Sequence, residues 1–315
     1  PGKDEEDAAV RFLRWLRDNG ASFPKLKWPV TTPNGLRGAV ALDPIASGET
    51  MLSIPRRLMI SEETCWADAS LRRVYAENRD VFARDDPVLA LFLVREMAKG
   101  SASFYFPYLS ILPEVETVQD WSPAELDELR DSTLVDAAAR RTTEMEAYYR
   151  RIKQRLQDKY QDEMPVEDFT FERFRFAWKT IQARTFGRRL PWTALVPFAD
   201  CLNHSNVATK YDFDVDGSNA FRLFPSSNNN YSQGCEVFNS YGRRPNVQLL
   251  LDYGFVLDDN EWDFVDVELP RDSTQAVGRR FAFRKRLRLE RHTTLEMIFP
   301  MAAFPATRPD GLPDV

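Results

Sequence analysis

The chain has 315 residues, a mass of 36.4 kDa and a formal net charge of −6 at pH 7. This length allows one large domain or two ordinary ones, and either can bury a core without disulfides or metals. With 43% hydrophobic and 29% charged residues, the composition predicts a soluble globular protein. The acidic balance argues against sequence-independent nucleic-acid binding, which needs clustered Lys and Arg. No apolar run approaches the 18 residues of a membrane helix.

Glycine, histidine and cysteine are scarce. The 13 Gly are so dispersed that no G-x-G occurs, which excludes the dinucleotide-binding fingerprint and the P-loop. The three Cys have no C-x-x-C spacing, and His204 and His292 lie far apart, so we predict no metal site. An odd, sparse set of thiols fits a reducing, intracellular compartment, without distinguishing plastid from cytoplasm or nucleus.

The N-terminal part of the chain is predicted to contain one helix followed by two strands. Residues 5–18 have the apolar periodicity of an amphipathic helix, which Asn19-Gly20 ends. Residues 36–42 and 50–54 are predicted strands, with residues 46–49 as the turn between them and a proline directly after the second.

A helical signal extends from about residue 61 to 182. Asp86-Pro87 predicts a helix start, with an N-cap carboxylate and proline at the first position. The S-P-A-E sequence at 122–125 is a capping box that opens a long charged helix reaching about Tyr160, with a break near 132–133. An aromatic stripe at helical spacing then predicts a core-facing helix. It consists of Phe171, Phe174, Trp178 and Ile181.

After residue 190, short apolar pieces alternate with polar loops, and a basic helix is predicted over 273–291. The apolar pieces are 194–197, 220–224, 236–241 and 264–269. Single short strands cannot bury their faces, so the strands at both ends of the chain must meet. The helical block is therefore interpreted as an insertion into a β-rich fold.

Two segments, 196–205 and 236–255, place polar groups directly beside apolar runs. Buried polar groups are costly without partners, so such positions point to a binding site. Cys201 and Cys235 are interpreted as small core residues.

These segments carry a resemblance. Asn203-His204-Ser205, followed by Tyr241-Gly242 and Tyr253-Gly254-Phe255, resembles the SET-domain signature, in the branch of protein methyltransferases similar to Rubisco large-subunit lysine methyltransferase. Further similar segments follow in the expected order and extend the resemblance from about residue 8 to 310. They are 36–41, 45–49, 103–113 and 183–186, the last with Ala183 where the family commonly has Ser.

The resemblance implies an α+β SET fold, in which short β-sheets are tied by a pseudoknot that brings the Asn203 and Tyr241 segments together. A catalytic domain would span 1–270, with a helical insert at about 71–182. Residues 271–315 would begin a C-terminal helical substrate-binding domain, which we expect to be truncated here.

The resemblance also implies S-adenosylmethionine as cofactor, with S-adenosylhomocysteine as its product, and no metal. Arg184 would meet the cofactor carboxylate, where a planar cationic fork is useful, although it could also act as a helix C-terminal charge. The adenosyl part would be held by Asp200, Cys201, Leu202, Asn203 and His204. The backbone at Gly35, Leu36 and Arg37 would line the cofactor, and Tyr253, Gly254 and Phe255 would close its pocket.

Methyl transfer from a sulfonium to lysine is an in-line displacement that needs a neutral amine, whose pKa is normally near 10.4. An apolar channel and the sulfonium charge lower that pKa, so alignment and desolvation do the main work. Tyr241 is the candidate catalytic residue for orienting the amine, not for removing its proton. On its own, Tyr241 could equally be a core tyrosine. Phe186, Tyr241 and Tyr253 are the candidate substrate-binding residues.

The predicted function is a protein-lysine N-methyltransferase acting on a non-histone protein. A related branch acts on histidine and carries Asn where this chain has Phe186, and an apolar Phe suits an alkyl amine better than an imidazole. A non-catalytic SET-like peptide-binding module is the alternative from another class. We expect a protein substrate as partner, no nucleic acid, no membrane and a monomer.

Overall fold

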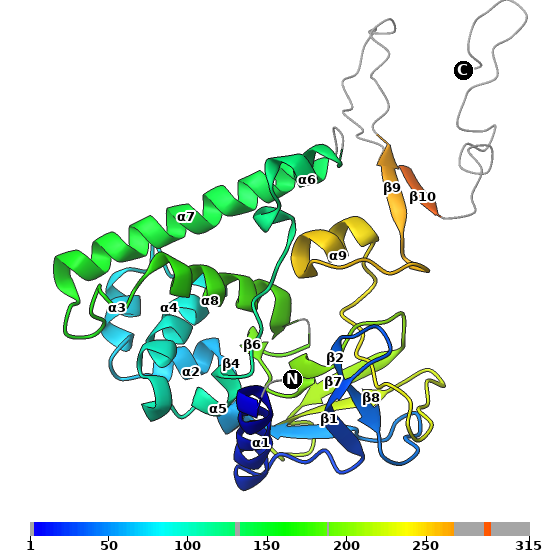
Figure 1. Cartoon of the computed structure of the whole chain (residues 1–315). Helices are drawn as coiled ribbons and strands as arrows, with labels where there is room; N and C mark the ends of the chain where they lie inside the picture. Colours follow the sequence, from blue (N-terminus) through cyan, green and yellow to red (C-terminus); the bar gives the residue numbers. More distant parts are fainter. Residues whose placement is uncertain (1–2, 130–132, 188, 268–286, 291–315) are drawn as a thin grey trace, which may run out of the picture.

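The computed structural model describes residues 3–129, 133–187, 189–267 and 287–290. Figure 1 shows the helices gathered on one side and the short sheets on the other, with a long helix along the outer edge of the helical side. The architecture is therefore α+β, with the two kinds of element segregated.

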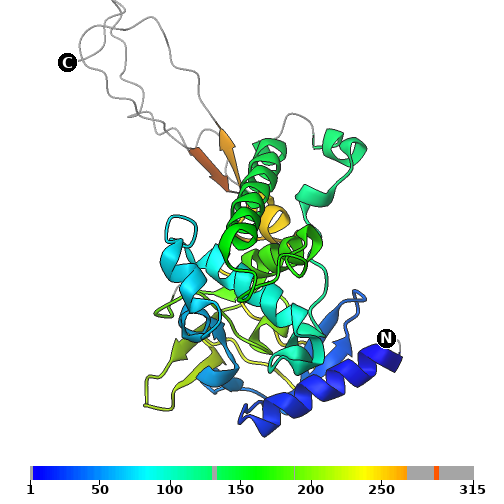
Figure 2. The same ribbon diagram turned by 90° about the vertical axis from the view of Figure 1, so that its left-hand side faces the viewer.

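The N-terminal helix α1 spans Lys3–Asp18 and confirms the predicted amphipathic helix. Phe12 and Leu16 are fully buried on its inner face. Figure 2 shows α1 lying along the edge of the molecule, where it contacts α5 (Phe106–Leu109) of the helical side.

The two strands predicted near the N-terminus belong to different sheets, one of two strands and one of three. β2 (Arg37–Ala41) pairs antiparallel with β1 (Leu26–Thr31), a strand that the sequence analysis missed. β3 (Leu52–Pro55) pairs instead with β8 (Ala220–Pro225), which also pairs with β7 (Thr209–Phe213). The predicted turn at 46–49 therefore connects strands of different sheets.

A third sheet joins the two sides of the helical block. β4 (Ile60–Ser61) precedes the helices, and β5 (Thr185–Phe186) and β6 (Ala194–Leu195) follow them, with β6 in the middle. This pairing confirms that strands from the two ends of the sequence meet across the helices. The proposed domain boundaries at 270 and at 71–182 stay predictions.

Seven helices lie between β4 and β5 in the described residues. They are α2 (Glu62–Ala67), α3 (Arg72–Glu77), α4 (Asp85–Ala98), α5, α6 (Pro123–Asp127), α7 (Thr133–Lys159) and α8 (Phe171–Arg184), with short 3-10 turns at Gly100–Ala102 and Val118–Asp120. Two more 3-10 turns, Arg56–Leu58 and Ala199–Cys201, lie in the sheet region. α4 packs on α8. Phe174, Trp178 and Ile181 are buried there, which confirms the aromatic stripe.

The predicted helix starts are partly correct. The capping box is confirmed, since the Ser122 side chain accepts from the Glu125 amide and Glu125 accepts from the Ser122 amide. However, α6 is short, and α7 begins separately at Thr133. Asp86 is not the N-cap of α4: the helix begins one residue earlier, so Asp86 lies in its first turn.

The C-terminal elements are α9 (Asn246–Tyr253), β9 (Phe264–Val267) and β10 (Leu287–Glu290), and β9 pairs antiparallel with β10. The predicted basic helix over 273–291 is wrong for 287–290, which form a strand. Its remaining residues, and the second domain beyond 290, lie outside the described residues.

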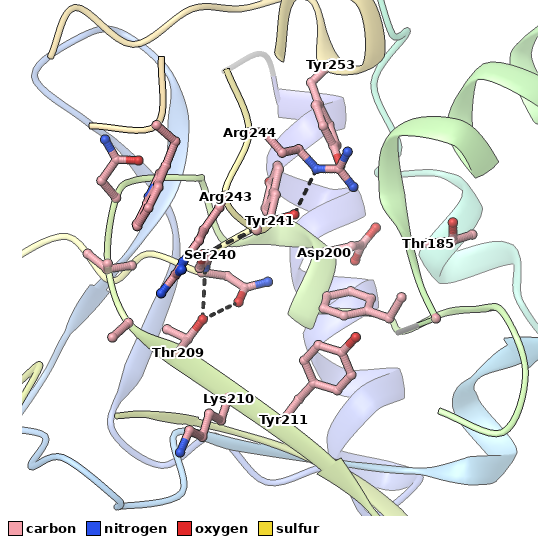
Figure 3. Close-up of a pocket in the computed structure, with 18 of the residues that line it drawn as sticks. Thr185, Asp200, Thr209, Lys210, Tyr211, Ser240, Tyr241, Arg243, Arg244 and Tyr253 are labelled. Carbon is pink, nitrogen blue, oxygen red and sulfur yellow. Dashed lines mark hydrogen bonds between the residues drawn. The ribbon is translucent and has the colours of Figure 1, made fainter. Parts of the chain in front are cut away.

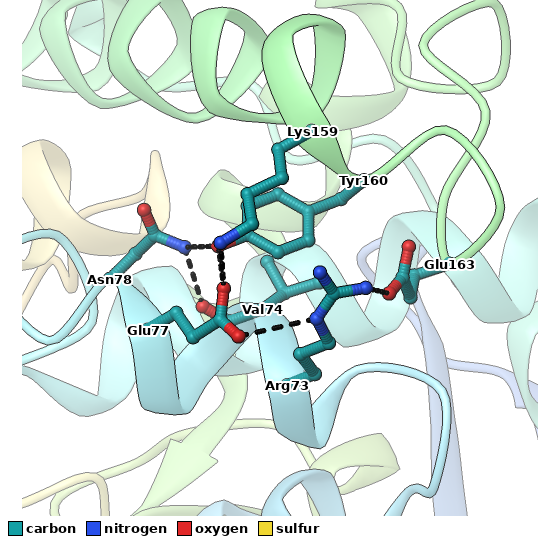
Figure 4. Close-up of polar contacts among 7 residues, drawn as sticks. All are labelled: Arg73, Val74, Glu77, Asn78, Lys159, Tyr160 and Glu163. Atoms are coloured by element: carbon teal, nitrogen blue, oxygen red, sulfur yellow. Dashed lines mark hydrogen bonds and ion pairs between the residues drawn. The ribbon is translucent and has the colours of Figure 1, made fainter.

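A polar network fastens α3 to the end of α7 (Figure 4). The Glu77 carboxylate accepts hydrogen bonds from Lys159 Nζ at 2.5 Å, Tyr160 Oη at 2.7 Å and Arg73 Nε at 3.2 Å. Lys159 is the main cause of the lowered pKa of Glu77, which falls to about 2. A carboxyl group in the unfolded chain titrates near 4.3, so the folded state gains stability from Glu77 only where its carboxylate is ionised.

We therefore expect Glu77→Gln to lose stability relative to the wild type at neutral pH, and this difference to shrink as the pH falls from about 4.5 to 2. Urea unfolding across that range measures it. Glu167→Gln is the matched control, because Glu167 is exposed and has no hydrogen bond or ion pair among the described residues. A difference for Glu77→Gln that does not depend on pH would contradict this account.

Candidate active site

The two segments that place polar groups beside apolar runs, 196–205 and 236–255, lie side by side. The Asn239 amide donates to the Asn203 carbonyl at 2.8 Å, and His204 forms a parallel bridge with Asn239. The Tyr241 amide donates to His204 Nδ1 at 3.1 Å. These contacts confirm that the Asn203 and Tyr241 segments meet, and they fix the backbone of one segment against the other.

Tyr241 stands at the centre of this junction. Its hydroxyl donates to the Leu202 carbonyl at 2.9 Å, and its ring stacks on the His204 imidazole with centroids 4.9 Å apart. The Tyr253 ring lies 5.0 Å away, and Phe255 contacts Tyr241, Tyr253 and His204. Burial raises the pKa of Tyr241, so its hydroxyl stays protonated at neutral pH. The group is therefore suited to orientation and not to proton removal.

His204 is a buried, neutral imidazole. Burial lowers its pKa. Nδ1 lies 3.1 Å from the Tyr241 amide nitrogen and 3.3 Å from the Asn239 carbonyl oxygen, so this one nitrogen makes both polar contacts of the ring. Nε2 is buried and has no hydrogen-bond partner among the described residues. Such an unpaired buried polar atom is costly, and it fits a site completed by a polar ligand.

Arg184, the last residue of α8, is held by Asp200. Arg184 Nη1 donates to the Asp200 carbonyl at 2.9 Å and to its carboxylate at 3.3 Å, which also accepts from Tyr108 Oη at 2.8 Å. Burial raises the pKa of Asp200, and Arg184 opposes that shift. Arg184 Nε is buried without a partner among the described residues. The guanidinium is thus anchored at one nitrogen, while another is left unpaired.

Residues 32–36 form the tight turn between β1 and β2. The Gly35 amide donates to the Thr32 carbonyl at 2.9 Å, and Gly35 has a φ of 76°. Leu36 is 59% exposed, so its side chain is not committed to the core. The Arg37 carbonyl accepts from Asn203 Nδ2 at 3.2 Å, which ties this turn to the Asn203 segment.

The approach of this turn to Asn203 requires Gly38. A Cβ at position 38 would lie 2.8 Å from the Glu236 carboxylate and 2.9 Å from Asn203 Nδ2. Asn203 Nδ2 itself donates to Glu236 at 2.8 Å. The β2 backbone, Asn203 and Glu236 therefore form one close-packed unit.

A cavity of about 740 Å³ opens beside the junction (Figure 3). It brings together five of the predicted site residues: Arg184, Phe186, Asp200, Tyr241 and Tyr253. The remaining predicted residues do not line it. They are Gly35, Leu36, Arg37, Cys201, Leu202, Asn203, His204, Gly254 and Phe255. Of these, Leu202 and His204 bond directly to Tyr241, at the wall of the cavity.

Part of the wall is aromatic. The Phe186 ring packs edge-on against Tyr211 at 5.5 Å and Phe221 at 5.2 Å. The sequence analysis missed Tyr211, which lies on β7 and lines the cavity. The alternation of Tyr211 and Phe213 with polar residues was the available signal for that strand. Thr209, Lys210, Arg243 and Arg244 also line the cavity and were missed.

The helical block supports Tyr253. Asp252, one residue earlier on α9, pairs with Arg141 of α7 at 2.5 Å and with Arg244 at 3.4 Å. Arg244 Nε donates in turn to the Tyr241 carbonyl at 3.0 Å. The two tyrosines are thus linked to each other and to α7 through charged groups.

Cysteine placement corrects one expectation. Cys201 is buried, as predicted, and burial raises the pKa of its thiol. Cys235 is exposed, so it is not a core residue. Within the described ranges, no three His, Cys, Asp or Glu side chains gather as a metal site would need. In the same ranges, no helix combines the length and apolar character needed to cross a membrane.

No protein-family model matches the chain. Among curated proteins, it is 30% identical over 260 residues to the chloroplastic [fructose-bisphosphate aldolase]-lysine N-methyltransferase of Arabidopsis thaliana, over 78% of this chain and 51% of that protein. It is 26% identical over 277 residues to the actin-histidine N-methyltransferase of Canis lupus familiaris, over 84% of this chain and 45% of that protein. The chain thus spans about half the length of these relatives.

Solved structures share the fold. The SET domain of LSMT bound to lysine and AdoHcy superposes with a TM-score of 0.72 and 24% identity, covering 87% of this chain and 63% of that one. Rubisco LSMT bound to sinefungin and monomethyllysine gives 0.69 and 26%, covering 85% and 61%. The short sheets, the Asn203–Tyr241 junction and the similarity to these structures all point to the same fold. The chain is a SET-domain protein of the branch similar to Rubisco LSMT.

Proposed function

We propose that this chain is an S-adenosylmethionine-dependent protein N-methyltransferase whose target is lysine. The junction of His204 with Tyr241 carries the proposal, because it sets a fully oriented tyrosine hydroxyl at the wall of a cavity. The solved structure of Rubisco LSMT holds sinefungin together with monomethyllysine. This supports a site that takes both a cofactor and a lysine.

The residues present fit a cofactor with polar ends. His204 Nε2 and Arg184 Nε are buried polar nitrogens without partners among the described residues. In this proposal Arg184 meets a carboxylate, while Asn203, His204 and the backbone at 35–37 hold the adenosyl part. Phe255 and Tyr253 close the site over Tyr241. When bound, S-adenosylmethionine supplies an electrophilic methyl group on a sulfonium.

The chain's own contribution is to orient and desolvate the amine. The Tyr241 proton is committed to the Leu202 carbonyl, which leaves the phenol oxygen free to accept from an amine N–H. The aromatic wall at Phe186 and Tyr211 excludes water from the alkyl stem. An apolar surrounding lowers the pKa of a lysine amine and so favours its neutral, reactive form.

Histidine is the second candidate target, since the actin-histidine N-methyltransferases are similar over 84% of this chain. An imidazole needs a hydrogen-bond partner at its second nitrogen. Phe186 offers none, and it packs on two further aromatic rings. This favours lysine.

The test is a methylation assay on a proteome extract with labelled S-adenosylmethionine, followed by mass-spectrometric mapping of the modified residues. We expect label on lysine side chains. Label on histidine alone would overturn the lysine assignment and keep the methyltransferase. Absence of transfer, together with no calorimetric binding of S-adenosylmethionine at millimolar concentration, would overturn the proposed function altogether and support a non-catalytic binding module.

A further inference from the structure

Three exposed cations line the cavity and form no ion pair within the described part of the chain. Arg189 follows β5, Lys210 lies on β7, and Arg243 follows Tyr241 and Gly242. Figure 3 shows Lys210 and Arg243 on the side of the cavity opposite Thr185 and Asp200. None of the three forms an ion pair with any residue that the structure describes. We call Arg189, Lys210 and Arg243 the cationic rim.

Several other charges of this region are already paired. Arg184 pairs with Asp200, and Arg244 pairs with Asp252. Near Lys210 in the sequence, Asp212 and Asp216 both pair with Arg222 and are not available to neutralise the rim. The exposed Glu261 also lines the cavity, so one carboxylate faces the three rim cations. A positive excess remains at this site although the whole chain carries −6.

Arg243 is held in place before any partner arrives. Its guanidinium lies 4.3 Å over the centre of the Trp262 ring. Stacking of this kind orients the plane of the guanidinium and leaves its N–H edges free to bind a carboxylate in two-pronged fashion. A long flexible cation would lose more conformational entropy on binding, so this stacking favours recognition of an anion.

We infer that the site selects target residues flanked by Asp or Glu, which the cationic rim binds while the target side chain enters the cavity. The inference rests on the proposed function and specifies its substrate class: an acidic segment of a protein. Successive residues of an extended chain are about 3.3 Å apart, so side chains within a few positions of the target reach the rim.

The experiment compares two synthetic peptides of equal length with one central lysine. One carries Glu at the flanking positions, and the other carries Gln there. Binding is followed by fluorescence anisotropy and methyl transfer by labelled S-adenosylmethionine. At low salt we expect the Glu peptide to be preferred by about tenfold, mainly through KM, and the preference to shrink at high salt.

The rim variant replaces Arg189, Lys210 and Arg243 with Gln and should bind the two peptides alike. The matched control replaces Arg14, Lys27 and Arg140 with Gln. These three are also exposed, make no ion pair among the described residues and do not line the cavity. The control changes net charge equally and should keep the preference. Thermal unfolding of both variants verifies that they are folded.

The outcomes separate the two proposals. Equal binding of both peptides, binding of neither, or a preference that survives in the rim variant overturns the rim inference. Methyl transfer to both peptides at equal rates also overturns the rim inference, but it leaves the proposed function standing. A rim-dependent binding preference without transfer to any acceptor, in a protein that does not bind S-adenosylmethionine, supports the rim and overturns the proposed function.

Discussion

Replacing Tyr241 with Phe is expected to reduce methyl transfer by about 10²–10³-fold while the protein still binds S-adenosylmethionine. The substitution removes only the hydroxyl, which donates to the Leu202 carbonyl at 2.9 Å. The ring remains stacked on His204, so the wall of the cavity is preserved. In the proposed mechanism, the variant has no group at this position to orient the amine. Single-turnover rates and calorimetric titration of the cofactor measure the two effects separately.

Tyr231→Phe is the matched control for this variant. The Tyr231 hydroxyl also donates to a backbone carbonyl, that of Phe238 at 2.9 Å, but Tyr231 does not line the cavity. Both variants should lose about 1 kcal/mol of stability from the deleted hydrogen bond. Only Tyr241→Phe should lose activity. Wild-type rates in Tyr241→Phe would show that Tyr241 is a structural core residue.

Gly254→Ala is expected to destabilise the fold more than any other glycine replacement described here. Gly254 ends α9 in the left-handed conformation with a φ of 81°, and a Cβ there would lie 1.8 Å from the Glu116 carbonyl oxygen. The left-handed backbone alone costs an alanine about 1–2 kcal/mol. The clash is with backbone, which must move, and this should add about 2 kcal/mol or more.

Gly217→Ala is the control that separates the steric clash at Gly254 from the effect of the left-handed backbone. Gly217 has a φ of 74°, and nothing lies within 4 Å of the position its Cβ would take. Urea unfolding of the two variants should therefore differ by the steric contribution alone. Equal loss of stability in both variants would mean that the backbone near Glu116 can shift to make room for the Cβ without lowering the free energy of unfolding. In that case, the segment after α9 would not be held by the helical block.

Local signals in the sequence predicted local structure well. The helix at the N-terminus and the capping box at 122–125 depend on contacts between residues three or four positions apart, and both are confirmed. The strand Leu26–Thr31 was missed because it contains Pro29, which normally argues against a strand. Its pairing with β2 is irregular between Lys27 and Val30, and Pro29 lies in that irregularity.

The pairing between strands that are distant along the chain could not be predicted from the sequence. Residues 36–42 and 50–54 are predicted strands that are close along the chain, yet their partners are β1 and β8. Which strands pair is decided by burial of whole faces, and a single sequence does not show it. The same limit applied to the cavity. Tyr241 and Phe186 lie in recognisable motifs, whereas Tyr211 and the cationic rim reach the cavity only through the tertiary fold.

The sheets that join distant strands also bear on the order in which the molecule assembles. β3 and β8 bring Leu52 opposite Leu223, and β4 and β6 bring Ile60 opposite Leu195. Closing such long loops costs chain entropy before the strand contacts compensate for it. The helices between β4 and β5 make mainly shorter-range contacts and can form earlier, which shortens the effective loop. We therefore expect the helical block to form before the β4 and β6 edges pair, so that it acts as a scaffold for this sheet.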